Sequence, residues 1–331
     1  MAIHEGRRGR RVQGVRDGVL VVDKPEGMTS FAVVDRVRRW LKTRKAGHCG
    51  TLDPFATGVL VLCLNQATRV ADQLAGQDKS YRFVVTLGVE TDTLDKTGQA
   101  IWTYQGPPKT EDQLKEALES FRGSLVQQVP RHSAVKVGGK RLYQLSRKGV
   151  EVERPRRPVE IHRLDLLEYR WPRACLQALC SKGTYIRQLA SDLGARLGCG
   201  GFVSELRRLA SGSFTLEDAV SLEELPSLRA EGRWKNKLIS LNRALAHLPA
   251  VQVEDERVLK LLRDGCLDPR WEASHERDLP TGEGPVRLMA AGDRLVALWW
   301  RESKEKKEDR LRRGSRSCQG SGRQRRLRVF R

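Results

Sequence analysis

The sequence predicts a mixed α/β fold, because two kinds of hydrophobic pattern occur along its 331 residues. Short apolar runs bounded by turn residues are typical of buried strands, whereas apolar residues recurring every three or four positions are typical of helices. Strands are expected at residues 19–24, 59–64, 81–87, 174–180, 286–290 and 295–300. Helices are expected at residues 33–41, 111–121, 186–197, 203–210 and 258–264, with a helical connector over 222–249. Apolar residues make up 39% of the chain, which is enough for a hydrophobic core.

The first strand and the first helix are separated by strong turn signals. Pro25 ends the strand at 19–24, because proline has no N–H to donate to a neighbouring strand. A turn at 27–30 follows, and the Ser30 hydroxyl is expected to accept from the first free N–H groups of the next helix. Valines and a leucine recur along that helix at helical spacing, while arginines occupy its other face.

The stretch at 47–69 holds the most constrained loop of the sequence. Its glycines allow turns that other residues would resist, and Pro54 biases the preceding Asp53 toward an extended or turn conformation. The apolar run at 59–64 predicts a buried strand behind the loop. One carboxylate on a rigid loop suits a nucleophile or a base; on these residues alone, a plain turn or capping aspartate is the alternative.

The formal net charge of +20 is confined to three segments. Residues 1–16 hold five Arg and one Glu, residues 123–158 hold nine basic and two acidic residues, and residues 302–331 hold twelve basic and four acidic residues. The rest of the chain is nearly neutral. A basic excess gathered into segments is typical of a protein that binds a polyanion, so nucleic acid is the expected ligand. The alternative, a solubilising charge run, more often mixes both signs.

Several classes of protein do not fit the sequence. No run of about 18 apolar residues occurs, so no membrane-spanning helix is expected, and the Arg-rich N-terminus lacks the apolar segment of a secretory signal. The cysteines are scattered and form no C-x-x-C pair, which favours the reducing cytoplasm over a disulfide framework or a zinc site. They are Cys49, Cys63, Cys175, Cys180, Cys199, Cys266 and Cys318.

Two further segments carry local patterns. The polar loop at 91–98 contains Asp92 and Asp95, but it lacks the glycine turn and the terminal glutamate of a calcium loop, so no metal is expected there. In the basic segment at 123–158, Gly138 and Gly139 predict a hairpin turn.

The segment GHCGTLDPFATGVLVLCLNQATR resembles the signature of the TruB family of pseudouridine synthases, which isomerise a uridine in the T-arm of transfer RNA. In that family the Asp of the Gly-Thr-Leu-Asp-Pro turn is the catalytic residue, here Asp53. Further motifs match in the same order: DKPEGMTS, the strand that begins at Tyr81, SAVK and LY in the basic segment, and GTYIR. Together they cover residues 17 to about 215. Two positions depart from the family: Cys49 replaces a usual Thr, and His132 replaces a usual Tyr or Phe.

The resemblance implies a set of site residues around Asp53. Arg187, in GTYIR, would pair with Asp53. Independently, an Arg at a helix start faces the unfavourable end of the helix dipole, which a carboxylate partner would explain. The other implied roles are base stacking and proton transfer for Tyr81, nucleotide contact for Tyr185, lining of the uracil pocket for Leu206, filling of the gap left by the flipped uridine for His48, and support of the pocket for Lys24. Without the resemblance, a core or surface position is the commoner role for each of them.

The resemblance also implies the pseudouridine synthase fold, with a large, mainly antiparallel mixed sheet flanked by helices. The expected organisation is a basic arm at 1–16, a catalytic domain at 17–249 with an RNA-clamping insertion at 123–158, a small β-rich PUA-like RNA-binding domain at 250–301, and a basic tail at 302–331. The tail mixes Lys, Arg, Ser and Gly without periodicity, so it is expected to be disordered until RNA orders it.

The implied reaction needs no cofactor. The bond from ribose C1′ to uracil N1 breaks, the base rotates, and C1′ joins C5, so no redox step and no departing group call for a nicotinamide or a metal. The expected protein is a monomeric tRNA pseudouridine synthase for position 55, with no obligatory protein partner and no membrane attachment. The alternatives are a non-catalytic RNA-binding or RNA-folding protein on the same scaffold and a guide-RNA-dependent synthase of the dyskerin type. Attack at C1′ and a glycal route both stay open.

Overall fold

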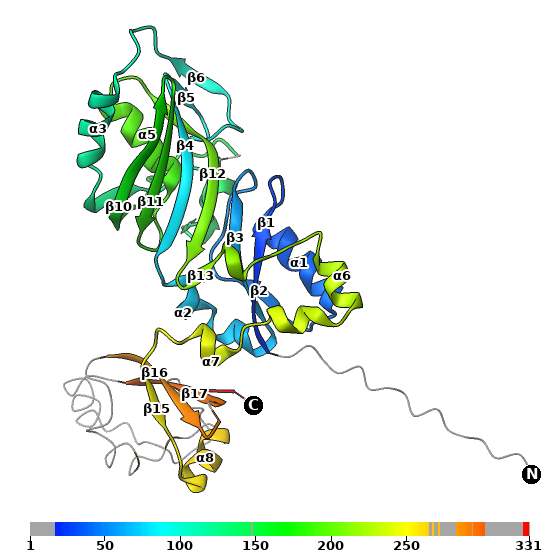
Figure 1. Cartoon of the computed structure of the whole chain (residues 1–331). Coiled ribbons are helices and arrows are strands. Elements are labelled where there is room, and N and C mark those ends of the chain that lie inside the picture. The colour runs from blue at the N-terminus through cyan, green and yellow to red at the C-terminus, as the bar shows by residue number, and fades with distance from the viewer. Residues whose placement is uncertain are drawn as a thin grey trace, which may run out of the picture.

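A large ten-stranded sheet and a separate four-stranded sheet organise the chain (Figure 1). The computed structural model describes residues 17–146, 148–264, 267, 271, 283–292, 294–301 and 327–330. The expected basic arm at 1–16 lies outside the described residues, as do residues 302–326 of the expected tail.

The ten-stranded sheet is mixed and mainly antiparallel, which confirms the expected fold class. Its main order is β14-β1-β3-β12-β4-β11-β10-β7, with β2 paired to β3 and β13 paired to β12. Within the described part of this sheet, only the β1–β14 and β3–β12 pairs are parallel. The strands are β1 (Gly18–Lys24), β2 (Ala46–His48), β3 (Thr57–Leu64), β4 (Lys79–Leu87), β7 (Gly123–Gln128), β10 (Arg156–Arg170), β11 (Arg173–Cys180), β12 (Gly201–Ser211), β13 (Phe214–Thr215) and β14 (Val220–Ser221).

Several hydrophobic cores hold helices against this sheet, and two of them pack its longer helices. Helices α3 (Glu111–Glu119) and α5 (Ile186–Arg196) lie beside the strands of the upper part in Figure 1, and their apolar residues share a core with those of β4, β11 and β12. Helix α1 (Ser30–Leu41) buries its valine stripe against β1 and β3 in the second core. The periodic apolar faces of both α1 and α5 therefore lie where the sequence predicts them.

The N-cap of α1 differs from the expectation. Thr29, and not Ser30, accepts a hydrogen bond from the Ala32 N–H, at 3.0 Å. Thr29 has the extended backbone that an N-cap residue requires. Ser30 is one residue inside the helix, and its buried hydroxyl instead donates to the carbonyl of Leu52 at 3.0 Å and accepts from the Leu52 N–H at 2.8 Å.

The expected helix at 203–210 is wrong, because these residues belong to strand β12. This strand pairs antiparallel with β4, with register shifts between Val203 and Glu205 and between Arg208 and Ala210. Each shift adds an unpaired residue to β12 and breaks the strict alternation of a strand. The apolar residues consequently acquire the spacing of a helix although they face a sheet core.

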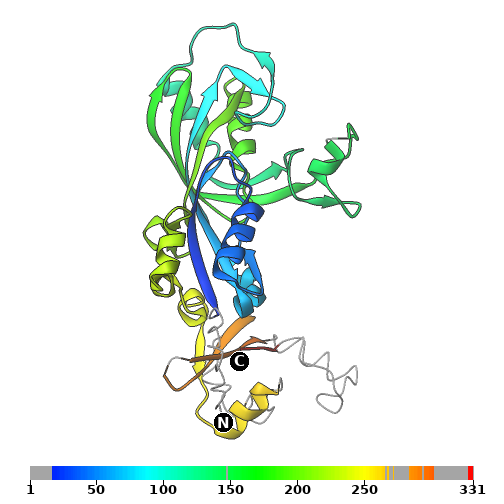
Figure 2. The same ribbon diagram turned by 90° about the vertical axis from the view of Figure 1, so that its right-hand side faces the viewer.

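The remaining elements between residues 17 and 249 are short. They are η1 (Asn65–Val70), α2 (Ala71–Ala75), β5 (Val89–Thr91), β6 (Ala100–Thr103), β8 (Lys136–Val137), β9 (Lys140–Arg141), α4 (Leu142–Ser146), η2 (Leu216–Asp218), α6 (Leu225–Ala230), η3 (Arg233–Lys237) and α7 (Leu241–Ala244). Gly138 and Gly139 have φ of +56° and +81° and form the predicted hairpin turn between β8 and β9. Figure 2 shows that this hairpin and α4 project away from the body of the sheet.

The C-terminal sheet has the order β15-β16-β17-β18, and helix α8 shares its hydrophobic core. Its elements are β15 (Ala250–Gln252), α8 (Glu256–Arg263), β16 (Gly284–Ala290), β17 (Arg294–Arg301) and β18 (Leu327–Val329). The expectation of disorder over 302–331 is wrong for β18, whose Leu327 and Val329 enter the core of this sheet. Within the described ranges, no helix is long and apolar enough to cross a membrane.

Candidate active site

The loop that carries Asp53 is held rigidly on both sides. Leu52 and Phe55 flank the aspartate in sequence and are buried at 3% and 5% exposure. Ser30 binds both backbone groups of Leu52, and the carbonyl of Asp53 accepts from the Ala56 N–H at 3.1 Å. Two buried apolar anchors therefore fix the backbone while the Asp53 side chain stays 32% exposed.

Lys24 supports the same loop from the side of β1. Its ammonium group donates to the carbonyls of Pro25, Met28 and Pro54 at 2.8, 2.7 and 3.1 Å. The residue is fully buried, and this burial lowers the pKa of Lys24 to about 8, although the charge of Asp53 opposes the shift. The DKPEGMTS segment and the Asp53 loop are thereby joined by one side chain.

Arg187 forms a two-point contact with Asp53. Its Nε donates to Asp53 Oδ2 at 2.9 Å and its Nη2 donates to Oδ1 at 3.1 Å. The guanidinium also donates to the carbonyls of Thr93 and His132 at 3.1 and 2.9 Å. Because the planar fork matches a carboxylate, this contact fixes both the position and the orientation of Asp53.

Asp95 forms a second carboxylate contact with Arg187, one that the sequence alone does not predict. Its Oδ2 lies 3.6 Å from Arg187 Nη1, and its Oδ1 accepts from the Thr93 hydroxyl and the Thr97 N–H at 2.8 and 2.9 Å. The acidic loop at 91–98 thus positions the Arg187 side chain through Asp95. Asp92 accepts instead from the Gln99 N–H at 2.9 Å, so the two aspartates of that loop have separate roles.

These neighbours determine the charge of Asp53. Burial raises the pKa of Asp53 above its ordinary value, the Arg187 guanidinium opposes this rise, and the charge of Asp95 adds to it. An ionised carboxylate at this position consequently depends on Arg187.

A cavity of about 400 Å³ opens beside the Asp53–Arg187 pair. Tyr81 from β4, Leu206 from β12 and Tyr185 from the start of α5 line it together with the two charged residues. Tyr81 and Leu206 are nearly buried, at 8% and 7% exposure, and present apolar surface toward the cavity. The structure therefore brings five of the seven expected site residues to one cavity.

Lys24 and His48, the other two expected site residues, do not line this cavity. Lys24 lies behind the Asp53 loop, whereas His48 ends the short strand β2 and precedes the loop in chain order. Burial lowers the pKa of His48, and its Nδ1 has no hydrogen-bond partner within the described part of the chain. The role expected of His48 stays a prediction.

The two departures from the family pattern have simple structural consequences. His132 contributes its backbone carbonyl to Arg187, so this contact does not depend on the side chain. Cys49 is buried, and its Sγ lies 3.1 Å from the Sγ of Cys63 on β3. A small side chain at position 49 is compatible with this apolar core.

Gln127 and Ser30 are further positioning residues. The buried side chain of Gln127 bonds both backbone groups of Tyr185, at 2.9 and 3.0 Å, and so fixes the chain just before Arg187. Gln127 stands in none of the matched motifs, and Ser30, the last residue of DKPEGMTS, was expected only to cap a helix. Neither contact is signalled by the local sequence, because each joins segments far apart in the chain.

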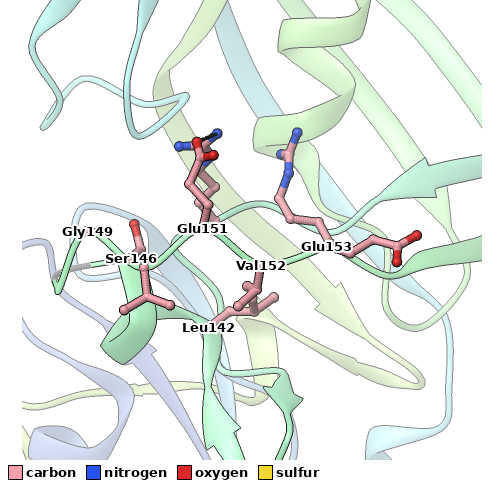
Figure 3. A pocket seen from close by; sticks show the side chains of 9 residues that line it. Leu142, Ser146, Gly149, Glu151, Val152 and Glu153 are labelled. Atoms are coloured by element: carbon pink, nitrogen blue, oxygen red, sulfur yellow. Dashed lines mark ion pairs between the residues drawn. The ribbon is translucent and has the colours of Figure 1, made fainter.

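A second cavity, of about 460 Å³, lies in the basic insertion between α4 and residues 149–154 (Figure 3). Arg131 and Arg154 line it with Glu151 and Glu153, and Arg131 lies 3.5 Å from Glu151. Its charges are mixed, and it is distinct from the cavity beside Asp53.

Comparison with known proteins identifies the family. A model of the N-terminal domain of TruB family pseudouridylate synthases matches residues 38–186, and a model of the tRNA pseudouridylate synthase B C-terminal domain matches residues 187–248. The tRNA pseudouridine synthase B of Syntrophobacter fumaroxidans is 56% identical over 295 residues, which cover 89% of this chain and 96% of that protein. The tRNA pseudouridine synthase B of Syntrophus aciditrophicus is 43% identical over 284 residues, covering 85% and 90%.

Solved structures agree with this assignment. A chain of a Cbf5–Nop10–Gar1 complex aligns with a TM-score of 0.67 and 26% identity, over 95% of this chain and 84% of that chain. A chain of an H/ACA RNP bound to a substrate RNA containing 2′-deoxyuridine aligns with a TM-score of 0.65 and 26% identity, over 88% and 80%. With the sequence matches and the site geometry, the conclusion is that this chain belongs to the TruB family of pseudouridylate synthases.

Proposed function

We propose that the protein converts the T-loop uridine at position 55 of transfer RNA to pseudouridine. The observation that carries this proposal is the Asp53–Arg187 pair at the wall of a cavity lined by Tyr81, Tyr185 and Leu206. Similar proteins named tRNA pseudouridine synthase B support transfer RNA as the substrate.

The target uridine leaves its stack and enters the cavity, where Tyr81 and Leu206 hold the uracil between them. Unstacking costs a few kcal/mol, and His48 is the residue proposed to fill the gap. Tyr185, two residues before Arg187 in the chain, contacts the nucleotide.

Asp53 acts on the ribose in its ionised form. Its carboxylate either attacks C1′ or removes a ribose proton toward a glycal, and uracil departs with the electron pair of the C1′–N1 bond. After rotation, C5 bonds to C1′, C5 loses its proton and N1 gains one, so the product is an isomer of the substrate. Arg187 keeps the half-buried Asp53 charged, and Asp95 holds Arg187 in place. The chemistry uses no cofactor and no metal.

RNA binding is assigned to the basic segments. The hairpin and α4 of the insertion at 123–158 project from the sheet and would clamp the RNA stem (Figure 2), and the C-terminal sheet would serve as a PUA-like contact. We propose that the protein works in the cytoplasm as a monomer without an obligatory partner. The similar chains of an H/ACA RNP and of a Cbf5–Nop10–Gar1 complex favour the guide-dependent alternative only by fold, at 26% identity.

The test is incubation of the purified protein with an unmodified tRNA transcript, followed by carbodiimide-block primer extension. A stop at position 55 that disappears in Asp53→Asn, while RNA affinity persists, is the expected result. Tight binding without a stop would contradict the proposal and favour an RNA-folding or guide-dependent protein.

A further inference from the structure

A basic surface that the net charge of the chain conceals lies along helix α1 and just after it. Residues 35–45 hold six basic residues and one acid, and acidic residues elsewhere in the chain offset this excess. The valines and the leucine of α1 are buried, so the cations occupy its outer face and the connection to β2. All six cations are exposed, and together they are called the α1 patch: Arg36, Arg38, Arg39, Lys42, Arg44 and Lys45.

The three cations of the α1 patch that follow the helix have no partner in the protein. The side chains of Lys42, Arg44 and Lys45 form no hydrogen bond or ion pair with any residue that the structure describes. Asp35, the one acid of the segment, pairs with two arginines of the helix itself, at 2.8 and 2.7 Å. The helix dipole favours a cation near the last turn, but neighbouring like charges repel each other. Three further cations therefore add repulsion without an internal contact, and their charge is available to a ligand.

The position of the α1 patch relative to Asp53 follows from the helix. Helix α1 begins at Ser30, whose hydroxyl bonds both backbone groups of Leu52, next to Asp53. Its 12 residues span about 18 Å, so the far end of α1, where the three unpaired cations lie, is about that distance from the Asp53 loop. Salt screens exposed charges beyond about 8 Å under physiological conditions. These cations therefore act on nucleotides other than the uridine beside Asp53.

The α1 patch is also separate from the insertion that would clamp the RNA stem. Residues 132–135 of the insertion line the cavity beside Asp53, whereas none of residues 30–45, all of which the structure describes, lines it. Figure 2 shows α1, in dark blue, below the projecting hairpin of the insertion. A stem held by that hairpin would leave the α1 patch free for another part of the same RNA.

Aromatic rings accompany the cations of α1. Phe31 is 74% exposed on the first turn of the helix, beside the Asp53 loop, and the Arg36 guanidinium lies 5.5 Å from the centroid of the Trp40 ring. Surfaces that bind RNA combine cations, which neutralise phosphates, with aromatic rings, on which bases stack. This combination favours RNA over an acidic protein as the ligand of the α1 patch.

We propose that the α1 patch binds phosphates of the transfer RNA that lie outside its T-arm, while the T-loop uridine occupies the cavity beside Asp53. The inference rests on the proposed function, which makes a complete tRNA the substrate. Contacts between exposed Lys or Arg side chains and phosphates position an RNA without reading its sequence. The α1 patch thus raises the affinity for a complete tRNA over that for an isolated T-arm, and it takes no part in the reaction itself.

The test compares the binding of two unmodified transcripts, a complete tRNA and its T-arm stem-loop alone, by fluorescence anisotropy from about 50 to 200 mM salt. The variant replaces Lys42, Arg44 and Lys45 with Gln, which removes three exposed charges and no internal contact. For the complete tRNA, the slope of log affinity against log salt should become about 2–3 less steep, at about 0.7–0.9 for each phosphate. The unaltered protein should then lose about 20–40 times more affinity than the variant across this range of salt. For the T-arm alone, the two slopes should be equal.

The matched control replaces Arg229, Lys235 and Lys237 with Gln. These three cations are also exposed, but they lie on α6 and η3, so the control changes the net charge equally at another place. It should bind both RNAs like the unaltered protein, and single-turnover rates with saturating protein should be equal for all three proteins. If the triple variant does not fold, Arg44→Gln with Lys45→Gln, which leaves the helix unaltered, should still make the slope for the complete tRNA about 1.4–1.8 less steep.

An unchanged slope for the complete tRNA would overturn the inference, and the α1 patch would then face solvent or an acidic protein. Equal reductions for the complete tRNA and the T-arm would also overturn it, because the patch would then touch the T-arm itself. So would a control that behaves like the variant, because net charge alone would then explain the effect. Failure of the unaltered protein to convert either RNA would instead contradict the proposed function, while the slopes would still report where RNA binds.

Discussion

Replacement of Arg187 by Gln should move the acid limb of the pH–rate profile to higher pH. Burial raises the pKa of Asp53, and Arg187 is the main group that opposes this rise. The neutral Gln side chain can keep one hydrogen bond to Asp53 but carries no charge. Asp53 then takes up a proton at a higher pH, and the ionised form needed for the reaction disappears there.

The direction of the shift follows from the geometry. An opposite charge in contact with a carboxylate lowers its pKa. Arg187 touches both oxygens at 2.9 and 3.1 Å, although the Asp53 side chain stays 32% exposed, which weakens the effect through solvent screening. We therefore expect the midpoint of the acid limb to rise in Arg187→Gln.

The assay is the single-turnover rate with saturating protein from pH 4 to pH 8, so that RNA affinity does not enter the rate. Arg187→Lys is the matched control, because it keeps the charge and removes only the fork. Arg187→Lys should lower the maximal rate of the pH–rate profile while leaving the midpoint of its acid limb near that of the unaltered protein. An unmoved midpoint in Arg187→Gln would refute the assignment of Arg187 as the group that keeps Asp53 ionised.

Three further predictions concern other parts of the molecule. Asp95→Asn removes a charge that raises the pKa of Asp53, so the midpoint of the same profile should move to lower pH; a rise would contradict this. Lys24→Met leaves three carbonyls without their donor and should destabilise the protein by about 1–3 kcal/mol in urea unfolding. Because the pKa of Lys24 is about 8 when folded and 10.5 ordinarily, the unfolded chain binds more protons between these values, so the unaltered protein becomes more stable as pH rises there. Lys24→Met should show a smaller rise, because Lys79, whose pKa burial also lowers to about 8, still contributes. Replacing the ten Lys and Arg at 302–326 with Ser, which retains β18, should reduce the slope of log affinity against log salt by about 0.7–0.9 for each phosphate that the segment neutralises; an unchanged slope would mean that this segment does not touch RNA.

The sequence by itself determined the mixed α/β class, six of the described strands (β1, β3, β4, β11, β16 and β17) and the Asp53 loop. These features rest on local physics: apolar runs, glycine and proline turns, and helical spacing act over a few residues. Helices α1, α3 and α5 and the Gly138–Gly139 turn lie where those patterns predict them. The pairing of Arg187 with Asp53 was predicted from the resemblance to the TruB family, which the position of an arginine at a helix start supports; without the resemblance a surface arginine was the commoner explanation.

Tertiary structure alone decided the identity of β12 and the residues that support the site. Residues 203–210 have helical spacing because bulges interrupt a strand, and only pairing with β4 reveals this. Asp95, Gln127 and Ser30 act on segments at least 22 positions away in the chain. A contact across such a distance depends on how the sheet assembles, so the local sequence of neither partner encodes it.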